Sequence, residues 1–276
     1  NIIPLAVIVA LTLVANFFTK PSFAGGGNFK NTAAIKTIGP FGSVSIPFTN
    51  VSSAPKWNAA NRSIRSKVVL DCRNTASCVL REKRVARILQ QGEKKSFYNK
   101  LKLINSQVNK LVYYQSDLQT YRQKDHWAAP DESLRSGVGD CEDYAILKMA
   151  LLQKLGIPAK AMSLVVLKDT KRNLYHAVLA VSTNKGTFIL DNVQPKVMKD
   201  HQLPHYLPLY SFSENRSWIH GWKKTQKKQL ALTRSSDFAN IAPGESFAVP
   251  PLKVSDINSQ DLLDLRPTMA QFSTVS

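Results

Sequence analysis

The stretch "VGDCEDYAILKMALLQKLGIP", Val138–Pro158, places one cysteine among three carboxylates and follows it with a helical pattern. Apolar residues recur at the helical interval on one side of the stretch: Ala145, Met149, Leu152 and Leu155. Gly156 is typical of a helix end, and Pro158 prevents the helix from resuming. The sequence therefore predicts a helix over 141–155 that begins at Cys141.

A cysteine at the start of a helix suits nucleophilic chemistry, because the helix dipole favours the thiolate. Such a nucleophile needs a base, usually a histidine, which a third group orients. His176 lies within "LYHAVLAV", where a lone histidine is more often a buried core residue than a catalyst. Asp191, in "FILDNV", is the candidate for the orienting group.

The segment "TNKG" between these two apolar runs predicts a tight hairpin. With a loop of two or four residues, Val178 faces Asp191 and His176 faces Val193. Side chains alternate along a strand, so His176 and Asp191 then project from the same face as diagonal neighbours. A three-residue loop would place them on opposite faces. The favoured register makes Cys141, His176 and Asp191 a candidate catalytic triad.

The order of the other elements predicts an α+β fold. Helical patterns cover 83–91 and 97–112, ahead of the helix at Cys141, and the strand-like run "AKAMSLVVL" follows that helix. The apolar positions of the second pattern are expected to face the core: Phe97, Leu101, Ile104, Val108, Leu111 and Val112.

Composition suggests where a central domain begins and ends. Residues 25–60 are rich in Gly, Ser, Pro and Asn and predict an irregular lead-in, and the helical pattern begins near Asn61. We expect the main domain over 61–236 and an extended tail over 237–276.

The first residues indicate export. An apolar run precedes Ser22-Phe23-Ala24, which has small residues where a signal peptidase reads them. We expect a signal peptide over 1–24, cleaved after Ala24, with no stable membrane insertion afterwards; the alternative is a retained membrane anchor.

The formal net charge of +18 predicts a strongly basic surface that favours acidic partners, anionic membranes or nucleic acid. Nucleic-acid motifs such as arginine-rich runs and zinc-finger spacings are lacking, so nucleic acid is not the expected partner.

The chain has three cysteines, and two of them suit a disulfide. Cys72 and Cys78 are close together in "DCRNTASC", and a bridge between them would leave Cys141 as a free thiol. The alternative is that all three are ordinary buried thiols. Trp127 in "HWAAP" is expected either to border the active-site cleft or help form the oxyanion site, or else to be a buried packing residue.

The motifs "GDCEDYAILKMALLQKLGIP", "HAVLAV" and "LDN", in this order, resemble the bacterial transglutaminase-like cysteine proteinases of the periplasmic LapG type. The resemblance implies a papain-like, transglutaminase-like core with the nucleophile at a helix N-terminus packed on an antiparallel sheet. It implies that Cys141 is the nucleophile, that His176 is the general base and then acid, and that Asp191 orients His176.

The carboxylates around Cys141 allow two interpretations. In the first, Asp140 is the N-cap of the helix, and Glu142 and Asp143 favour the positive end of its dipole. In the second, they bind Ca²⁺, which prefers oxygen ligands and would offset their effect on the thiol. The resemblance implies calcium dependence with Asp140 and Glu142 as ligands, and Asp143 is a further candidate.

The resemblance also implies a biological role. It implies a periplasmic, calcium-dependent endopeptidase that cuts a large surface adhesin near its N-terminus at a di-alanine site and so promotes biofilm dispersal. It implies an inner-membrane cyclic-di-GMP receptor that sequesters the protease. The alternatives are a transglutaminase-type amide acyl transferase, a non-catalytic envelope binding module, and a basic structural protein of the envelope.

Overall fold

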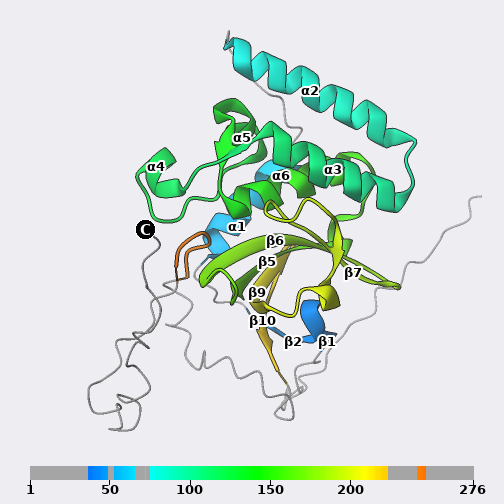
Figure 1. Cartoon of the computed structure of the whole chain (residues 1–276), viewed down its shortest axis with the longest axis vertical. Coiled ribbons are helices and arrows are strands. Elements are labelled where there is room, and N and C mark those ends of the chain that lie inside the picture. The colour runs from blue at the N-terminus through cyan, green and yellow to red at the C-terminus, as the bar shows by residue number, and fades with distance from the viewer. Residues whose placement is uncertain (1–36, 49–52, 66–71, 73–74, 223–240, 247–276) are drawn as a thin grey trace, which may run out of the picture. The chain divides into compact units, whose positions relative to one another are not determined.

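A computed structural model describes residues 37–48, 53–65, 72, 75–222 and 241–246 (Figure 1). All of them belong to one compact unit, Ala34–Ser276. The predicted signal peptide lies outside the described residues, and so does the predicted tail apart from 241–246.

Six α-helices form in the described residues, and three short 3₁₀ helices accompany them. The α-helices are α1 (Ala54–Arg65), α2 (Ala76–Glu93), α3 (Phe97–Leu111), α4 (Asp117–Tyr121), α5 (Pro130–Ser136) and α6 (Cys141–Lys154). The 3₁₀ helices are η1 (Pro40–Gly42), η2 (Ala159–Ala161) and η3 (Asp200–Gln202). None of the described helices combines the length and the apolar composition that a membrane span requires.

The strands form one large antiparallel sheet and one small parallel pair. The large sheet has the order β1-β2-β10-β9-β5-β6-β7-β8. Its strands are β1 (Thr37–Ile38), β2 (Val44–Pro47), β5 (Met162–Asp169), β6 (Leu174–Thr183), β7 (Gly186–Leu190), β8 (Met198–Lys199), β9 (Tyr206–Ser213) and β10 (Arg216–Gly221). The parallel pair consists of β3 (Tyr113–Tyr114) and β4 (Val138–Gly139). Helices and an antiparallel sheet in one domain confirm the predicted α+β class.

Helix α6 lies in the core between the sheet and α3 (Figure 1). Every residue from Cys141 to Leu152 is buried, which explains why the helix is apolar on more than one face. The helix ends at Lys154, and Gly156 adopts a left-handed φ of 85°, as the sequence predicts. Five of the six predicted core positions are buried, four of them on α3 and Val112 directly after it, whereas Phe97 is 37% exposed.

The predicted hairpin register is confirmed. Strand β6 pairs with β7 from Leu179↔Leu190 to Thr183↔Gly186, which is the register that places His176 and Asp191 on one face. Strand β5 pairs with β6 from Leu174 to Val181, which includes His176. The site residues on β6 are therefore held by a rigid element.

The predicted irregular lead-in is wrong for the part that the structure describes. Residues 37–47 supply strands β1 and β2 and the turn η1, and α1 begins at Ala54 instead of near Asn61. The serines of this stretch are buried because they have polar partners: Ser43 and Ser45 hydrogen-bond His220 Nδ1 at 3.0 and 3.3 Å. Composition alone indicates a loop here, because it does not show that His220, on a strand far along the chain, lies beside these serines.

Strands β9 and β10 are a second difference, because the sequence pattern assigned no strand to 206–221. Strand β9 pairs with β5 and β10, and it is buried at seven of its eight positions. Its apolar run is interrupted by Pro208 and by polar residues, which obscures the strand pattern. Pairing across a β-bulge between Val166 and Leu167 accommodates this sequence.

The cysteines pair as the sequence favours. Cys72 and Cys78 form a disulfide, with Cα atoms 5.4 Å apart, at the start of α2. Cys141 is free and buried. The predicted division into one structural bridge and one free thiol is confirmed.

Trp57→Ala tests whether α1 is an integral part of the fold. Trp57 is fully buried, stacks on Phe212 with ring centroids 5.7 Å apart, and donates a hydrogen bond to Glu214 O at 2.8 Å. We expect the substitution to lower the free energy of unfolding by about 3–5 kcal/mol in urea titrations. The exposed Arg62→Ala control on the same helix is expected to stay within about 0.5 kcal/mol of wild type. Equal stability of the two variants would contradict the assignment.

Candidate active site

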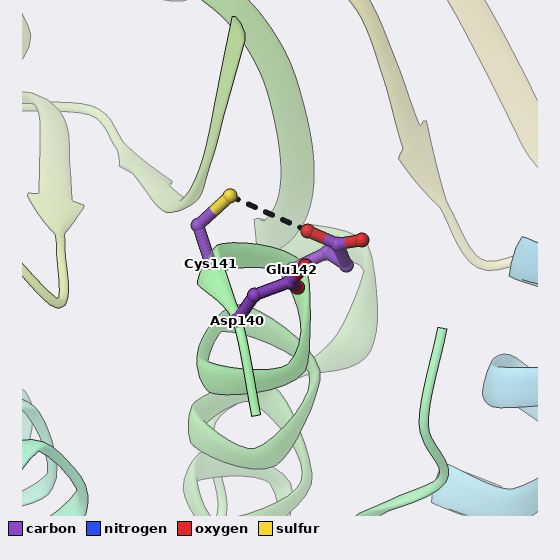
Figure 2. Close-up of side chains that lie close together, drawn as sticks. All are labelled: Asp140, Cys141 and Glu142. Atoms are coloured by element: carbon purple, nitrogen blue, oxygen red, sulfur yellow. Dashed lines mark hydrogen bonds between the residues drawn. The ribbon is translucent and has the colours of Figure 1, made fainter. Parts of the chain in front are cut away.

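Cys141 lies at the point where α6 begins, directly after β4 and Asp140. Its Sγ accepts a hydrogen bond from the backbone N–H of Ala177 at 3.3 Å. The thiol donates to Glu142 Oε2, also at 3.3 Å (Figure 2). Helix α6 thus presents the sulfur to strand β6 beside the residue that follows His176.

His176 and Asp191 meet as predicted. His176 Nε2 lies 2.9 Å from Asp191 Oδ1, and both side chains are buried. This contact engages one ring nitrogen and leaves Nδ1 for a second partner. Among the described residues, no hydrogen bond joins the imidazole to the Cys141 thiol, whose proton points to Glu142.

Tyr206 is a site residue that the sequence analysis missed. Its hydroxyl donates to Asp191 Oδ2 at 2.7 Å, and its ring packs edge-to-face with His176 at a centroid distance of 5.8 Å. The backbone N–H of Val193 donates to Asp191 Oδ1 at 3.0 Å. Burial alone would raise the pKa of Asp191, but His176 and these donors outweigh it and hold the pKa well below its usual value.

Helix α3 fixes the backbone of the same segment. Asn109 Nδ2 donates to Asp191 O at 2.9 Å, and Asn105 Nδ2 donates to Gln194 O at 3.0 Å. Asp191 is therefore held by its side chain from β9 and by its main chain from α3. The sequence pattern did not identify Asn105 and Asn109 as site residues. Their hydrogen-bond acceptors are backbone oxygens at 191–194, far along the chain, and a helical pattern does not predict that contact.

Five carboxylates gather beside the N-terminus of α6. They are Asp117, Asp125, Asp140, Glu142 and Asp143. Their oxygen atoms form overlapping groups in which ligand atoms lie within 4.8 Å of one another, and four of the five side chains are fully buried. The sequence analysis predicted three of these residues; Asp117 and Asp125 come from α4 and the loop after it.

Two of the five have their oxygens occupied by protein donors. Asp143 accepts from Ala128 N at 2.7 Å and from Asp140 N at 3.2 Å. Asp125 accepts from Trp127 Nε1 at 2.9 Å and from Lys56 Nζ. Asp140 is the N-cap of α6, as the capping interpretation predicts, and Asp143 completes the cap by accepting from the backbone N–H of Asp140.

The other three carboxylates each have one oxygen without a hydrogen-bond partner in the described part of the chain: Asp117 Oδ1, Asp140 Oδ1 and Glu142 Oε1. Buried acceptors of this kind are costly unless a cation or a water satisfies them. A group of carboxylate oxygens with free lone pairs is the donor set that Ca²⁺ prefers. The residues present thus fit a calcium ion.

Burial and mutual repulsion raise the pKa values of four carboxylates: Asp117, Asp140, Glu142 and Asp143. Burial is the largest cause in each case; the pKa rises to about 7 for Asp140 and to about 6 for Asp117. Burial and the charge of Asp140 raise the pKa of Glu142 well above its usual value and do the same for the Cys141 thiol. Without a cation, the cluster therefore opposes ionisation of the thiol.

Trp127 is a buried packing residue, the second of the two roles considered for it. Its side chain is 5% exposed, and its ring packs edge-to-face on Phe212 at 5.7 Å. Its indole N–H donates to Asp125, so the residue also supports the carboxylate cluster.

Comparison with known proteins places this geometry in a family. The sequence model of the bacterial transglutaminase-like cysteine proteinases (BTLCP) matches residues 69–226, which is more than half of the chain. The chain belongs to the bacterial transglutaminase-like cysteine proteinases. The match covers Cys141, His176 and Asp191, and membership of the BTLCP family shows a cysteine proteinase with a transglutaminase-like fold.

Solved structures of a LapG protein are similar to this BTLCP chain. Legionella pneumophila LapG is 26% identical over 63% of this chain and 89% of that one, with a TM-score of 0.49. Its calcium-bound form is 25% identical, covering 63% and 92% with a TM-score of 0.49. Its EGTA-treated form is 25% identical, covering 66% and 95% with a TM-score of 0.48. No curated protein sequence matches the chain significantly.

The raised pKa of Asp140 gives a prediction for the metal-free BTLCP protein. An unfolded aspartate titrates near pH 4, whereas folded Asp140 titrates near pH 7. The folded state holds the extra proton between these values, so this group costs stability progressively as the pH rises through the window. We expect Asp140→Asn to raise the free energy of unfolding by up to about 4 kcal/mol at pH 8 and by only about 1–2 kcal/mol at pH 5, which lies near the lower end of the window.

The measurement is urea unfolding of chelator-treated protein at both pH values. Groups that titrate in both proteins, such as His220, cancel in the comparison. Asp131→Asn, at a partly exposed ion pair with Arg135, is the control and should have a small effect at both pH values. Destabilisation by Asp140→Asn at pH 8 would contradict the charge-repulsion account.

Proposed function

We propose that this chain is a calcium-dependent cysteine endopeptidase whose triad is Cys141, His176 and Asp191. One observation carries the proposal: His176 Nε2 is bound to Asp191 at 2.9 Å, while the N–H of the adjacent Ala177 contacts the Cys141 sulfur. Nδ1 is then the ring nitrogen left for the thiol. Family membership supports the proteinase chemistry.

In the proposed reaction, His176 Nδ1 takes the thiol proton, and the Cys141 thiolate attacks the carbonyl carbon of a peptide bond. The peptide C–N bond then breaks, and His176 returns the proton to the departing amine. Water, deprotonated by His176, attacks the acyl-enzyme and releases the acid and the thiol. Asp191 accepts the Nε2 hydrogen bond throughout and stabilises the charged ring.

The developing oxyanion needs hydrogen-bond donors. The backbone N–H of Cys141 is suited to this role, because the first N–H groups of a helix have no partners within the helix. The sulfur and this amide belong to the same residue at the start of α6, which keeps the nucleophile and the donor in fixed relation.

We propose that Asp117, Asp140 and Glu142 hold the calcium ion, on the strength of their three unpartnered oxygens. Asp143, also predicted as a ligand, adds oxygens close to those of Asp117 and Asp140 while bonding the backbone. Bound calcium supplies positive charge that offsets the carboxylates beside the thiol. The hydrogen bond from Cys141 to Glu142 shows how closely the two groups are linked.

The substrate and partners that we propose follow from the family resemblance and from charge. The proposed substrate is a large surface adhesin, cut near its N-terminus at a di-alanine site in the periplasm, with release of the adhesin and biofilm dispersal as the outcome. The proposed regulator is an inner-membrane cyclic-di-GMP receptor that sequesters the enzyme. A net charge of +18 favours acidic surfaces on both.

The central test incubates the protein with the N-terminal segment of a candidate adhesin, in calcium or in EGTA. We expect cleavage at the di-alanine site in calcium and at least a tenfold lower rate in EGTA. Cys141→Ala should be inactive, and Asp117→Asn should need more calcium for half-maximal cleavage. Mass spectrometry of the products and calcium titration measure these results.

Three outcomes would overturn parts of the proposal. Undiminished cleavage in EGTA removes the calcium requirement, and cleavage by Cys141→Ala removes the nucleophile. Incorporation of a labelled amine in place of hydrolysis would identify the transglutaminase-type acyl transferase instead. A Cys141→Ala strain that keeps the wild-type biofilm phenotype would favour a binding module.

Tyr206→Phe tests the support of Asp191. Loss of the 2.7 Å hydrogen bond leaves one oxygen of a buried carboxylate unpaired and loosens the His176 ring. We expect kcat/KM to fall about tenfold, mostly in kcat, with a shifted pH profile. Tyr210→Phe, on the same strand, removes a buried hydroxyl that binds Ser53 and serves as the matched control. An unchanged pH profile for Tyr206→Phe would contradict this role.

A further inference from the structure

The segment Ile241–Ser246 lies against the site from a distant part of the chain (Figure 1, orange). Gly244 N donates to Tyr175 O at 2.8 Å, and Tyr175 N donates to Glu245 O at 2.9 Å. Ser246 forms an isolated antiparallel bridge with Leu174. The segment therefore occupies the edge of β6 immediately before His176.

This edge of β6 also faces the sulfur. In a strand, the N–H groups of residues i and i+2 point to the same side, about 7 Å apart. Tyr175 N binds the segment, and Ala177 N contacts Cys141 Sγ. A peptide that paired with this edge in an extended form would pass directly along the nucleophile, as strand-adding ligands do at open sheet edges. Strand β7 pairs with β6 only from Leu179 onward, and no other strand in the described part of the chain pairs with this edge before Leu179.

The segment is a tight turn that fits closely against the carboxylate cluster. Glu245 N donates to Ala242 O at 3.2 Å, and Gly244 has a φ of 87°, which together with Pro243 is typical of a type II turn. A Cβ on Gly244 would lie 3.1 Å from Tyr114 Oη and 3.7 Å from Asp140 Oδ2. A side chain at this position would meet both close contacts and backbone strain.

The triad is closed to solvent in this arrangement. Cys141 and His176 are each 2% exposed, and Asp191 is 1% exposed. Ile241, at the start of the segment, is 3% exposed and packs in the main hydrophobic core. A protein substrate cannot reach the sulfur until a covering element moves, and this segment covers the strand edge that the substrate needs.

We propose that 241–246 is an autoinhibitory strap, which occupies the site where the substrate main chain pairs with β6 at Leu174 and Tyr175. The proposal rests on the proposed protease function. It identifies the ligand of this edge as an extended peptide recognised through its main chain. The turn at Gly244 directs the strap's own backbone away from an extended path along the sulfur, so the strap blocks the edge without presenting a peptide bond for cleavage.

The test compares Gly244→Val with Gly221→Val in the full-length chain. Gly221 ends β10, and a Cβ there meets nothing within 4 Å, so it is the matched control. Because Cys72 and Cys78 are bridged, iodoacetamide reports on Cys141 alone. We expect Gly244→Val to raise the alkylation rate at least fivefold, to raise kcat/KM on a quenched fluorescent di-alanine peptide, and to speed exchange of the Tyr175 amide hydrogen.

A second variant is needed in case the segment keeps its position when Gly244 is replaced by valine. Replacing Ala242–Glu245 by a glycine–serine segment of equal length removes the turn. If the Tyr175 amide of this variant loses its protection from hydrogen exchange while the alkylation rate and kcat/KM stay at wild-type values, the strap proposal is wrong. Retained protection of the Tyr175 amide would also contradict the proposal, because the segment would then not be what covers the edge. Faster alkylation with no peptide cleavage in any variant would support the strap and overturn the protease function.

Discussion

The placement of strand β6 is the constraint on which the site depends. His176 on this strand bonds Asp191, and the backbone N–H of Ala177 contacts the sulfur of Cys141. Tyr175, directly before His176, bonds the segment 241–246 through its main chain. Pairing with β5 from Leu174 to Val181 prevents β6 from sliding, and the tight turn to β7 fixes its register. A shift by one residue would turn His176 to the other face and separate it from both partners.

The second constraint is electrostatic. The helix that carries Cys141 begins among five carboxylates, most of them away from water, and three of their oxygens have no donor within the described structure. Negative charge beside a thiol opposes its ionisation, whereas Asp191, on the other side of His176, has several donors and a lowered pKa. The fold therefore fixes the orientation of the His176 imidazole and the charge of Asp191. Ionisation of the Cys141 thiol still depends on the charge of the neighbouring carboxylates.

Sequence patterns predicted the parts of this arrangement that depend on local order. The helix at Cys141, the β6–β7 hairpin, its register and the meeting of His176 with Asp191 all follow from periodicity and turn residues over a short span. The same patterns did not predict the roles of Tyr206, Asn109 and Asp117, because each of these residues reaches the site from an element whose position is set by long-range packing. Strand β2 was missed for a similar reason: its serines indicate a loop until His220, from another strand, is placed beside them.

The contacts of α1 bear on how the protein is best handled as a recombinant fragment. The family match begins at residue 69, yet Lys56 bonds Asp125 of the acidic cluster and Trp57 stacks on the sheet. A fragment cut at the family boundaries would lose this helix and two strands, and would expose the aromatic surface of Phe212. The smallest autonomous unit therefore starts well upstream of the recognisable motif region, and expression boundaries are better chosen from packing than from similarity.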